Sequence, residues 1–508
     1  MEKPANMFAG WPDAGTEGPS FFWQGNDTLK VPRSMHQLTR QSVVKNLLAA
    51  GAQESGFAFV QGGVSTCRHD SDHEDVFRQE SSFHYLFGVA EPDCFGGLVL
   101  GTGESVLFVP KLPEVYATWM GPIASKEDYK KKYEVDKVCF VEEIASFVAE
   151  LKPSTIYVYS GVNSDSKTEA TPATFDGIDK YTVDKKILHP AIYEARVIKN
   201  EEELKVLRFA NQVSSAAHIS VMQKVRPGMM EYQMEADFLH HCYYNGGMRF
   251  ASYTAICGCG PNASVLHYGH AGAPNNRRLA QDEVTLNDMG CEYYCYASDI
   301  TCSFPIGGKF SAEQRAIYEA VLDANVKVMK TLAPGVSWVD MHLLAERTIA
   351  EHLLRLGYLR GDIEDIIAAE IPSVFMPHGL GHLMGIDTHD VGGYPEGAPR
   401  YKSLRMNRTL LEGMVLTVEP GCYFIGHLLE GALRDEQKAK HLVEDKLRAQ
   451  LGKFGGVRIE DNMAITSNGI ELLTNVPRTV REIETVMAGG AFPLADSDYP
   501  IPRPAPRK

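Results

Sequence analysis

The amino-acid sequence predicts an α+β fold of two domains, in which a smaller N-terminal α/β domain precedes a larger domain built from a duplicated ααββ unit. The length of 508 residues exceeds what one hydrophobic core usually holds. Helix-like and strand-like segments alternate between residues 35 and about 160. Beyond them, two Pro-Gly signals that end helices occur 107 residues apart, at 227 and 334. We place the domains at 1–190 and 191–490, followed by a Pro-rich tail at 491–508.

The N-terminal domain begins its periodic pattern at residue 35. The run MHQLTRQSVVKNLLAAGAQ is typical of a helix, and GFAFVQGG of a strand. In CFGGLVLGTGESVLFVP, GTGES indicates the turn of a hairpin; a phosphate loop is disfavoured because no Lys-Ser/Thr pair follows. The polar stretch 160–180 indicates a surface excursion before the boundary near residue 190.

The second domain begins with a helix that carries its own start signal. Asn200 lies three residues before Glu203, a capping arrangement, and apolar residues continue at helical spacing to Arg226-Pro-Gly. A second helix extends to Asn245-Gly-Gly. The same order recurs between residues 311 and 356, and β-rich sequence with two acidic residues follows each helix pair. This outline predicts two facing ααββ halves. The segment from residue 500 onward is expected to be unpacked.

Composition excludes several classes of protein. The net charge of −15 disfavours nucleic acid as a partner, and 44% apolar with 23% charged residues excludes a disordered chain. No run approaches the roughly 18 apolar residues that span a membrane. The first 18 residues lack the pattern of a signal peptide. Ten scattered cysteines suit reduced thiols, so we expect a cytoplasmic protein without a membrane contact.

Two aspartates stand out in the first of the two predicted ααββ halves. Asp288 and Asp299 lie in LNDMGCEYYCYASDITCSF, which otherwise has the composition of strands. Aspartate is depleted in strands, so its presence twice calls for an explanation. From this fragment alone, aspartates that cap the mouth of a hairpin are as good a reading as a functional pair.

The second half supplies further candidates. Glu419 ends an apolar strand in GMVLTVEPG, and Glu460 lies in GGVRIEDNMAIT, where burial is costly without a compensating cation. Between them, FMPHGLGHLMGIDTHDVGG carries His378, His382 and His389, the first two at a spacing that predicts one face of a strand. An oxygen-rich set of acids with one imidazole suits two adjacent divalent ions, Mn²⁺ or Co²⁺. The absence of HExxH argues against a single-zinc, thermolysin-like site.

The order of these residues resembles a known family. Asp288, Asp299, His382, Glu419 and Glu460 resemble the five metal ligands of the pita-bread metallopeptidases. The runs HYGHAGAPN, YASDITCSFP, FMPHGLGHLMGIDTHDVGGYPEG, VLTVEPG, FGGVRIED and LLTNVPRTV closely resemble the Xaa-Pro dipeptidases (prolidases) of that family, and RQESSFHYLFG and ATWMG extend the similarity into the N-terminal domain. The departures leave the five ligands intact and are Asn287, Cys291 and Asp461.

The resemblance implies a creatinase-like N-terminal domain, a pita-bread catalytic domain and a dinuclear site. Two ions, Mn²⁺ in the first place and Co²⁺ as an alternative, would be bridged by Asp299 and Glu460, with Asp288 on one ion and His382 and Glu419 on the other. A bridging hydroxide would hydrolyse Xaa-Pro dipeptides and release free proline, with Glu419 as the proton shuttle.

The resemblance also implies how the substrate is held. Arg405 matches the position that pairs with the substrate carboxylate, although as an isolated residue it would more often be a solvated surface arginine. His267 and His389 resemble the histidines that hold the carboxylate and the tetrahedral oxyanion; a lone His267 would otherwise suit a core histidine. Arg458 is expected to fix a ligand carboxylate, and both Arg458 and Tyr253 are placed with the substrate-binding residues.

Two other functions remain open from the sequence. The first is an Xaa-Pro aminopeptidase with the same metals and fold. The second is a metal-free relative, such as a creatinase or a binding protein, although such relatives lose ligands that this chain keeps. A homodimer is implied by the resemblance alone. Trp119 would then suit the pocket wall of the neighbouring subunit, although most tryptophans simply belong to a hydrophobic core.

Overall fold

The computed structural model describes residues 20–395 and 397–504, which form two compact α+β units, one through Glu203 and one from Leu204 onward. The N-terminal stretch in which no signal peptide is expected, and the last four residues of the tail, lie outside the described residues. Within the described part of the chain, no helix is both long and apolar enough to cross a membrane.

The first unit is built on a six-stranded mixed sheet with the order β6-β5-β4-β3-β7-β8. Strands β4 and β5 form the antiparallel hairpin predicted from GTGES, which is confirmed. Strand β3 pairs antiparallel with β4 and parallel with β7. Its inward residues Phe57 and Phe59 stack on each other, and Phe108 of β5 packs edge-on against Phe59 in the same core.

The elements of this unit run as follows. The helices are α1 (Met35–Ala49), α2 (Ser81–Phe87), α3 (Tyr116–Met120), α4 (Lys126–Tyr133), α5 (Ile144–Leu151) and α6 (Leu188–Val197). The strands are β1 (Phe21–Phe22), β2 (Val31–Pro32), β3 (Phe57–Gln61), β4 (Phe95–Val99), β5 (Ser105–Val109), β6 (Lys137–Phe140), β7 (Ile156–Val158) and β8 (Val183–Asp184).

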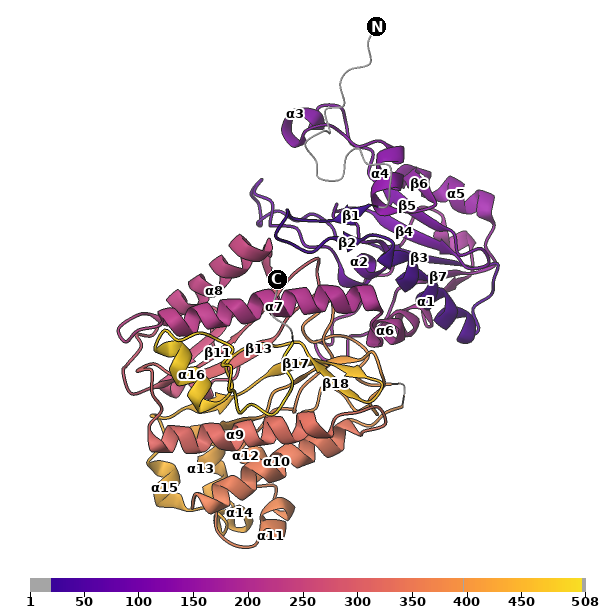
Figure 1. Cartoon of the computed structure of the whole chain (residues 1–508). Coiled ribbons are helices and arrows are strands. Elements are labelled where there is room, and N and C mark those ends of the chain that lie inside the picture. Colours follow the sequence, from indigo (N-terminus) through magenta and orange to yellow (C-terminus); the bar gives the residue numbers. More distant parts are fainter. Residues whose placement is uncertain (1–19, 396, 505–508) are drawn as a thin grey trace. The chain divides into compact units, whose positions relative to one another are not determined.

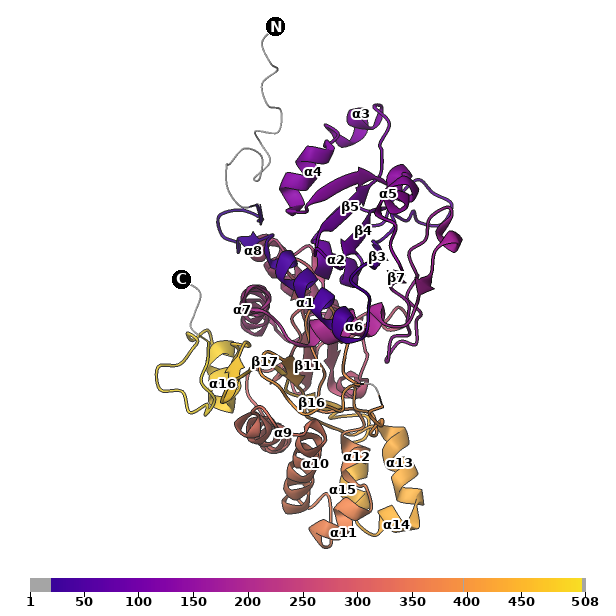
Figure 2. The ribbon, with the colours of Figure 1, turned by 90° about the vertical axis from the view of Figure 1, so that its right-hand side faces the viewer.

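The second unit contains the predicted duplication. Helices α7 and α8 precede a three-stranded antiparallel sheet of order β10-β11-β13, and α9 and α10 precede a second one of order β14-β17-β18. Figure 1 shows α7 and α8 along one side of these strands and α9 and α10 along the other, and the turned view of Figure 2 agrees. The two ααββ halves are therefore confirmed, and their strands lie between the helix pairs.

The elements of this unit run as follows. The helices are α7 (Glu201–Lys224), α8 (Glu231–Gly246), α9 (Ala312–Thr331), α10 (Trp338–Arg355), α11 (Ile363–Ala368), α12 (Pro372–Phe375), α13 (Gly426–Arg434), α14 (Glu436–Ala439), α15 (Glu444–Arg448) and α16 (Val480–Met487). The strands are β9 (Phe250–Ala251), β10 (Ile256–Cys259), β11 (Val284–Met289), β12 (Cys291–Glu292), β13 (Ile300–Pro305), β14 (Val415–Val418), β15 (Gly421–Tyr423), β16 (Gly456–Arg458), β17 (Asp461–Thr466) and β18 (Gly469–Leu472).

The helix starts follow from local hydrogen bonding. The Asn200 Oδ1 atom accepts the backbone N–H of Glu203 at 3.1 Å, and the Glu203 carboxylate accepts the N–H of Asn200 at 2.9 Å. This reciprocal cap satisfies donors that the first turn of α7 leaves free. Both Pro-Gly turns end in a glycine with φ near +90°, Gly228 and Gly335, a conformation that suits glycine. The repeated turn signal therefore has the same backbone cause in each half.

The segment from residue 500 was expected to be unpacked, and this expectation is wrong for its described part. Ile501 is buried, and the Arg503 guanidinium pairs with the Glu482 carboxylate of α16 at 2.7 Å and donates to the Val476 carbonyl at 2.6 Å. Proline removes backbone donors, but the side chains between the prolines still find partners.

Candidate metal centre

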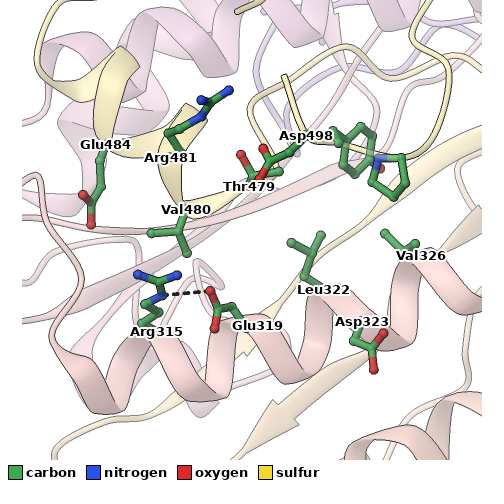
Figure 3. Close-up of a pocket in the computed structure, with 12 residues that line it drawn as sticks. Arg315, Glu319, Leu322, Asp323, Val326, Thr479, Val480, Arg481, Glu484 and Asp498 are labelled. Atoms are coloured by element: carbon green, nitrogen blue, oxygen red, sulfur yellow. Dashed lines mark hydrogen bonds and ion pairs between the residues drawn. The ribbon is translucent and has the colours of Figure 1, made fainter. Parts of the chain in front are cut away.

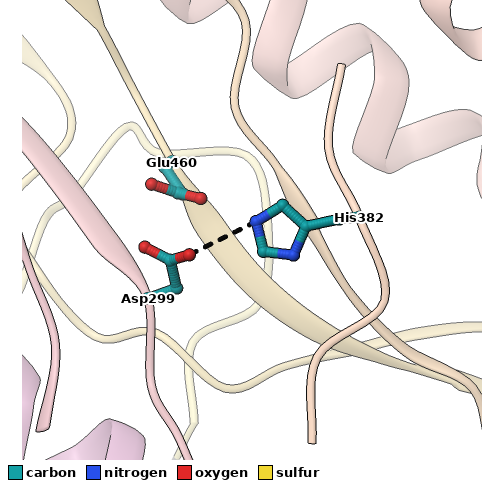
Figure 4. Close-up of side chains that lie close together, drawn as sticks. All are labelled: Asp299, His382 and Glu460. Carbon is teal, nitrogen blue, oxygen red and sulfur yellow. Dashed lines mark ion pairs between the residues drawn. The ribbon is translucent and has the colours of Figure 1, made fainter. Parts of the chain in front are cut away.

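Three of the predicted residues meet inside the second unit. Asp299 precedes β13, His382 lies between α12 and β14, and Glu460 lies between β16 and β17. One ligating atom from each lies within 4.8 Å of the others, and all three side chains are buried, Glu460 with 1% exposure. Figure 4 shows their polar atoms turned toward one another. Asp299 belongs to the first ααββ half and the other two to the second.

His382 has a defined orientation. Its Nδ1 atom donates to the Leu383 carbonyl at 3.0 Å, since a carbonyl can only accept. The Nε2 atom lies 3.3 Å from Asp299 Oδ2 and 3.5 Å from Glu419 Oε1. Burial lowers the pKa of His382, but the hydrogen bond to Asp299 and the charge of Glu419 raise it overall. Nε2 is the ring nitrogen turned toward the carboxylates, and so the one that would ligate a cation.

The segment that carries His382 is not the regular strand that the spacing of its histidines predicted. The segment instead lies alongside β14 as an extended chain. The N–H groups of Glu419 and Thr417 donate to the carbonyls of Leu380 and His382 at 2.8 and 2.9 Å. The approach depends on glycine, since a Cβ on Gly381 would lie 2.1 Å from the Thr417 carbonyl oxygen. Glycine-rich sequence allows close backbone contact without a continuous strand.

Asp288 lies on β11 and has two protein partners. One carboxylate oxygen accepts a hydrogen bond from Arg458 Nη2 at 2.5 Å, and the other accepts one from the Tyr253 hydroxyl. Arg458 therefore contacts Asp288 directly. Its link to Glu460 is indirect, since Arg458 Nε donates to Thr301 Oγ1 at 3.1 Å and that hydroxyl donates to Glu460 Oε2 at 2.7 Å.

A polar chain continues behind Arg458. Its Nη1 donates to the Tyr423 hydroxyl, which donates in turn to His378 Nε2, each at 2.9 Å. The His378 Nδ1 donates to the Gly379 carbonyl, so this histidine is neutral. Burial and then the Arg458 charge lower the pKa of His378 to about 3. Thr301 and Tyr423 were missed by the sequence reasoning, although Thr301 lies two residues after Asp299, on the same face of the chain.

The electrostatics test whether the cluster suits a cation. Burial, with the repulsion of Asp299, raises the pKa of Glu419 to about 7 and that of Asp288 to about 6, although Arg458 opposes both shifts. Burial and the repulsion of Asp299 also raise the pKa of Glu460 well above its usual range. These four carboxylates and His382 form an oxygen-rich donor set with more negative charge than Arg458 neutralises. A divalent cation fits such a set.

The candidate substrate-binding residues lie near this cluster. The His389 ring centroid is 4.5 Å from that of His382. Desolvation, then the His382 and Arg405 charges, lower the pKa of His389. Desolvation, then Arg405 and Arg458, lower the pKa of His267. The two histidines and Arg405 therefore share one electrostatic environment beside the acids. Trp119 belongs to the first unit, in α3, and is 79% exposed.

The three departures from the family pattern have different surroundings. Asn287 is buried and its amide contacts Met234 Sδ at 3.6 Å, while Cys291 is buried in β12.

Asp461, the third departure, is paired with Arg478 at 2.8 Å, a contact that the sequence did not reveal. Arg478 also donates to the carbonyls of Thr301, at 2.8 Å, and Glu460. It therefore joins the two chain segments that carry Thr301 and Glu460.

A surface pocket of about 470 Å³ lies elsewhere in the second unit, between α9, α16 and residues 498–500. Figure 3 shows its charged rim, where Arg315 and Glu319 of α9 form an ion pair at 2.8 Å. None of the predicted site residues lines it.

Comparison with known proteins agrees with this geometry. Residues 205–467 match the model of metallopeptidase family M24, and residues 36–159 match that of the aminopeptidase P N-terminal domain. The Xaa-Pro dipeptidase of Homo sapiens is 54% identical over 482 residues, covering 94% of this chain and 97% of that protein. Aminopeptidase PepP of Pseudomonas aeruginosa superposes with a TM-score of 0.74 at 33% identity, covering 90% of this chain and 98% of that one. Zn-substituted aminopeptidase P of E. coli in complex with product gives 0.74 at 30% identity, covering 90% and 99%.

The family match spans more than half of the chain and includes every acidic and histidine residue of the buried cluster. The matched N-terminal domain lies within the first unit and the matched peptidase domain within the second. With its buried Asp299, His382 and Glu460, the chain belongs to metallopeptidase family M24.

Proposed function

We propose that this chain hydrolyses Xaa-Pro dipeptides and releases free proline, with two divalent cations in the buried cluster. The observation that carries the proposal is the meeting of Asp299, His382 and Glu460 beside His267, His389 and Arg405. A negatively charged cluster for cations lies next to Arg405, whose guanidinium suits a small carboxylate, and next to two histidines that their lowered pKa keeps neutral. The 54% identity to the human Xaa-Pro dipeptidase over nearly the whole chain supports the same substrate class.

The ligand assignment follows the expected family pattern. The residues that would hold the two cations are Asp299 and Glu460, shared between them, Asp288 for one, and His382 with Glu419 for the other. When bound, such cations would acidify a water molecule and polarise the scissile carbonyl. Mn²⁺ is our first choice, with Co²⁺ as the alternative, because carboxylate-rich sets with one imidazole suit these ions.

Glu419 is the proposed proton shuttle. Its side chain keeps 18% exposure, so it can exchange protons with water, whereas Glu460 is enclosed. Burial places the pKa of Glu419 near neutrality, the range in which a carboxyl group both accepts and returns a proton. Glu419 takes the proton of the attacking water and delivers it to the proline nitrogen, which must be protonated to leave.

Arg405 and His267 read the substrate carboxylate in this proposal, and His389 stabilises the oxyanion. The planar guanidinium can bind both carboxylate oxygens. Arg458 and Tyr253, which we expected among the substrate-binding residues, are better assigned to Asp288, since both donate to its carboxylate. We also propose that the protein is a cytoplasmic homodimer, in which the exposed Trp119 contributes to the pocket of the neighbouring subunit. Light scattering on the purified protein measures its oligomeric state and tests this proposal.

The decisive experiment removes the metal and restores it. The purified protein is treated with a chelator, dialysed, and assayed for proline release from Gly-Pro with and without Mn²⁺. Activity that returns only with the metal supports the proposal; absence of metal-dependent proline release contradicts it. Asp299→Asn should abolish the effect. Asp323→Asn is the matched control, since Asp323 lies on α9 and pairs with His352.

An Xaa-Pro aminopeptidase is the second candidate, favoured by the likeness to two solved aminopeptidases P. Such an enzyme must leave the carboxyl side of proline open to a longer chain. Comparison of Ala-Pro with Ala-Pro-Ala separates the two functions. A preference for the dipeptide that disappears in Arg405→Ala supports the dipeptidase; a preference for the tripeptide supports the aminopeptidase.

A further inference from the structure

A fully buried carboxylate outside the metal cluster holds the segment that carries His267. Glu231, the first residue of α8, has 0% exposure. Its Oε1 atom accepts the Cys259 N–H at 2.9 Å and the Asn262 side-chain amide at 3.1 Å. Its Oε2 atom accepts the Tyr268 hydroxyl at 2.7 Å and the Arg277 N–H at 2.9 Å.

These four donors surround His267 along the chain. Asn262 lies five residues before it and Tyr268 directly after it, while Cys259 and Arg277 mark the two ends of the segment. His267 itself lies in an irregular stretch at the surface. Backbone in such a stretch takes its position from contacts of its neighbours, and here one carboxylate supplies contacts on both sides.

The segment that carries His267 is also connected to the metal cluster through buried side chains. Tyr268 packs in one buried group with Tyr423. The Tyr423 hydroxyl accepts a hydrogen bond from Arg458, which holds Asp288. A displacement of Tyr268 would therefore move the His267 imidazole first, whereas Asp288 keeps its own direct contacts with Arg458 and Tyr253.

We propose that Glu231 is a positioning residue for substrate recognition, which fixes His267 where it can bind the carboxylate of a dipeptide. The inference rests on the proposed function, since it assigns a supporting residue to the same site. Each carboxylate oxygen of Glu231 accepts one backbone N–H, and a backbone donor cannot reverse its direction. In Glu231→Gln the new NH₂ group must face one of these N–H groups in either orientation, so one end of the segment loses its anchor.

The experiment compares two substrates that differ only in the C-terminal carboxylate, the group that His267 would bind. Wild type and Glu231→Gln, both loaded with Mn²⁺, are assayed with Gly-Pro and with Gly-Pro-amide, and Mn²⁺ binding is measured by calorimetry. The expected result is a fall of about tenfold in the preference for the free carboxylate, through KM. The Mn²⁺ affinity should change by less than about twofold, because the ligands keep their contacts. Tyr268→Phe, which removes one of the four bonds, should give a smaller shift in the same direction.

Glu482→Gln is the matched control, because Glu482 is equally buried and accepts the backbone N–H groups of Arg478 and Thr479. It should lower thermal stability without changing the preference between the two substrates. An unchanged preference in both Glu231→Gln and Tyr268→Phe overturns the proposal, as does an equal shift in Glu482→Gln. A wild-type enzyme that cleaves Gly-Pro but does not distinguish the amide also overturns it and leaves the proposed function standing. Failure of the wild type to cleave Gly-Pro overturns both.

Discussion

Thr301→Val is expected to weaken metal binding while leaving the fold intact. The Thr301 hydroxyl donates to Glu460 Oε2 at 2.7 Å and accepts Arg458 Nε at 3.1 Å, and valine has the same shape without the hydroxyl. A hydrogen bond to a charged group contributes about 1.5–3 kcal/mol. If that energy orients Glu460 for a cation, its loss lowers affinity by roughly 10- to 100-fold.

The assay is calorimetric titration of chelator-treated protein with Mn²⁺. The matched control is Thr285→Val, because Thr285 is equally buried on the neighbouring strand β11 and its hydroxyl donates to the Gly258 carbonyl at 3.2 Å, not to an acidic residue of the cluster. Both variants should lose similar stability, but only Thr301→Val should lose affinity. Unchanged Mn²⁺ affinity in Thr301→Val, or an equal loss in Thr285→Val, refutes the reasoning.

Three further predictions concern separate features. Gly381→Ala should reduce Mn²⁺ affinity by about tenfold or more, because the new Cβ would lie 2.1 Å from the Thr417 carbonyl oxygen and displace the segment carrying a ligand; wild-type affinity would contradict this. Arg478→Met should cost about 3–5 kcal/mol in urea denaturation, because it leaves Asp461 buried without its cation, and Arg478→Met with Asp461→Asn should recover part of that loss; a double variant less stable than the single one counts against the pair. Burial, then nearby arginines, lower the pKa of His36 from 6.5 to about 3, so its contribution is present above pH 6.5 and is lost as pH falls toward 3. His36→Asn should therefore show a smaller fall in Tm between pH 6.5 and 4 than wild type, and parallel curves would exclude the assignment.

The sequence predicted the helices of the second unit well, because their signals are local. The Asn200 cap and the turns at Gly228 and Gly335 depend on residues within about one helical turn, so they can be read without knowing the fold. The duplicated order of helices and strands follows from these repeated signals.

The sequence was less informative where contacts join distant strands. The bond between Thr301 and Glu460 spans 159 residues, and that between Arg458 and Asp288 spans 170. The spacing of His378 and His382 suggested a strand because periodicity cannot distinguish regular pairing from an extended segment lying on β14. Glycine in that segment was the better signal, since close approach explains Gly381.

The division of the cluster between the two halves of the duplicated domain has a thermodynamic consequence. Asp299 comes from one half, and His382 and Glu460 come from the other, so neither half can assemble these three ligands alone. A cation bound to all three acts as a crosslink that exists only while the halves are docked, and its binding free energy adds to their association. Metal supply would then influence how long the folded protein survives proteolysis, independently of how fast it turns over substrate.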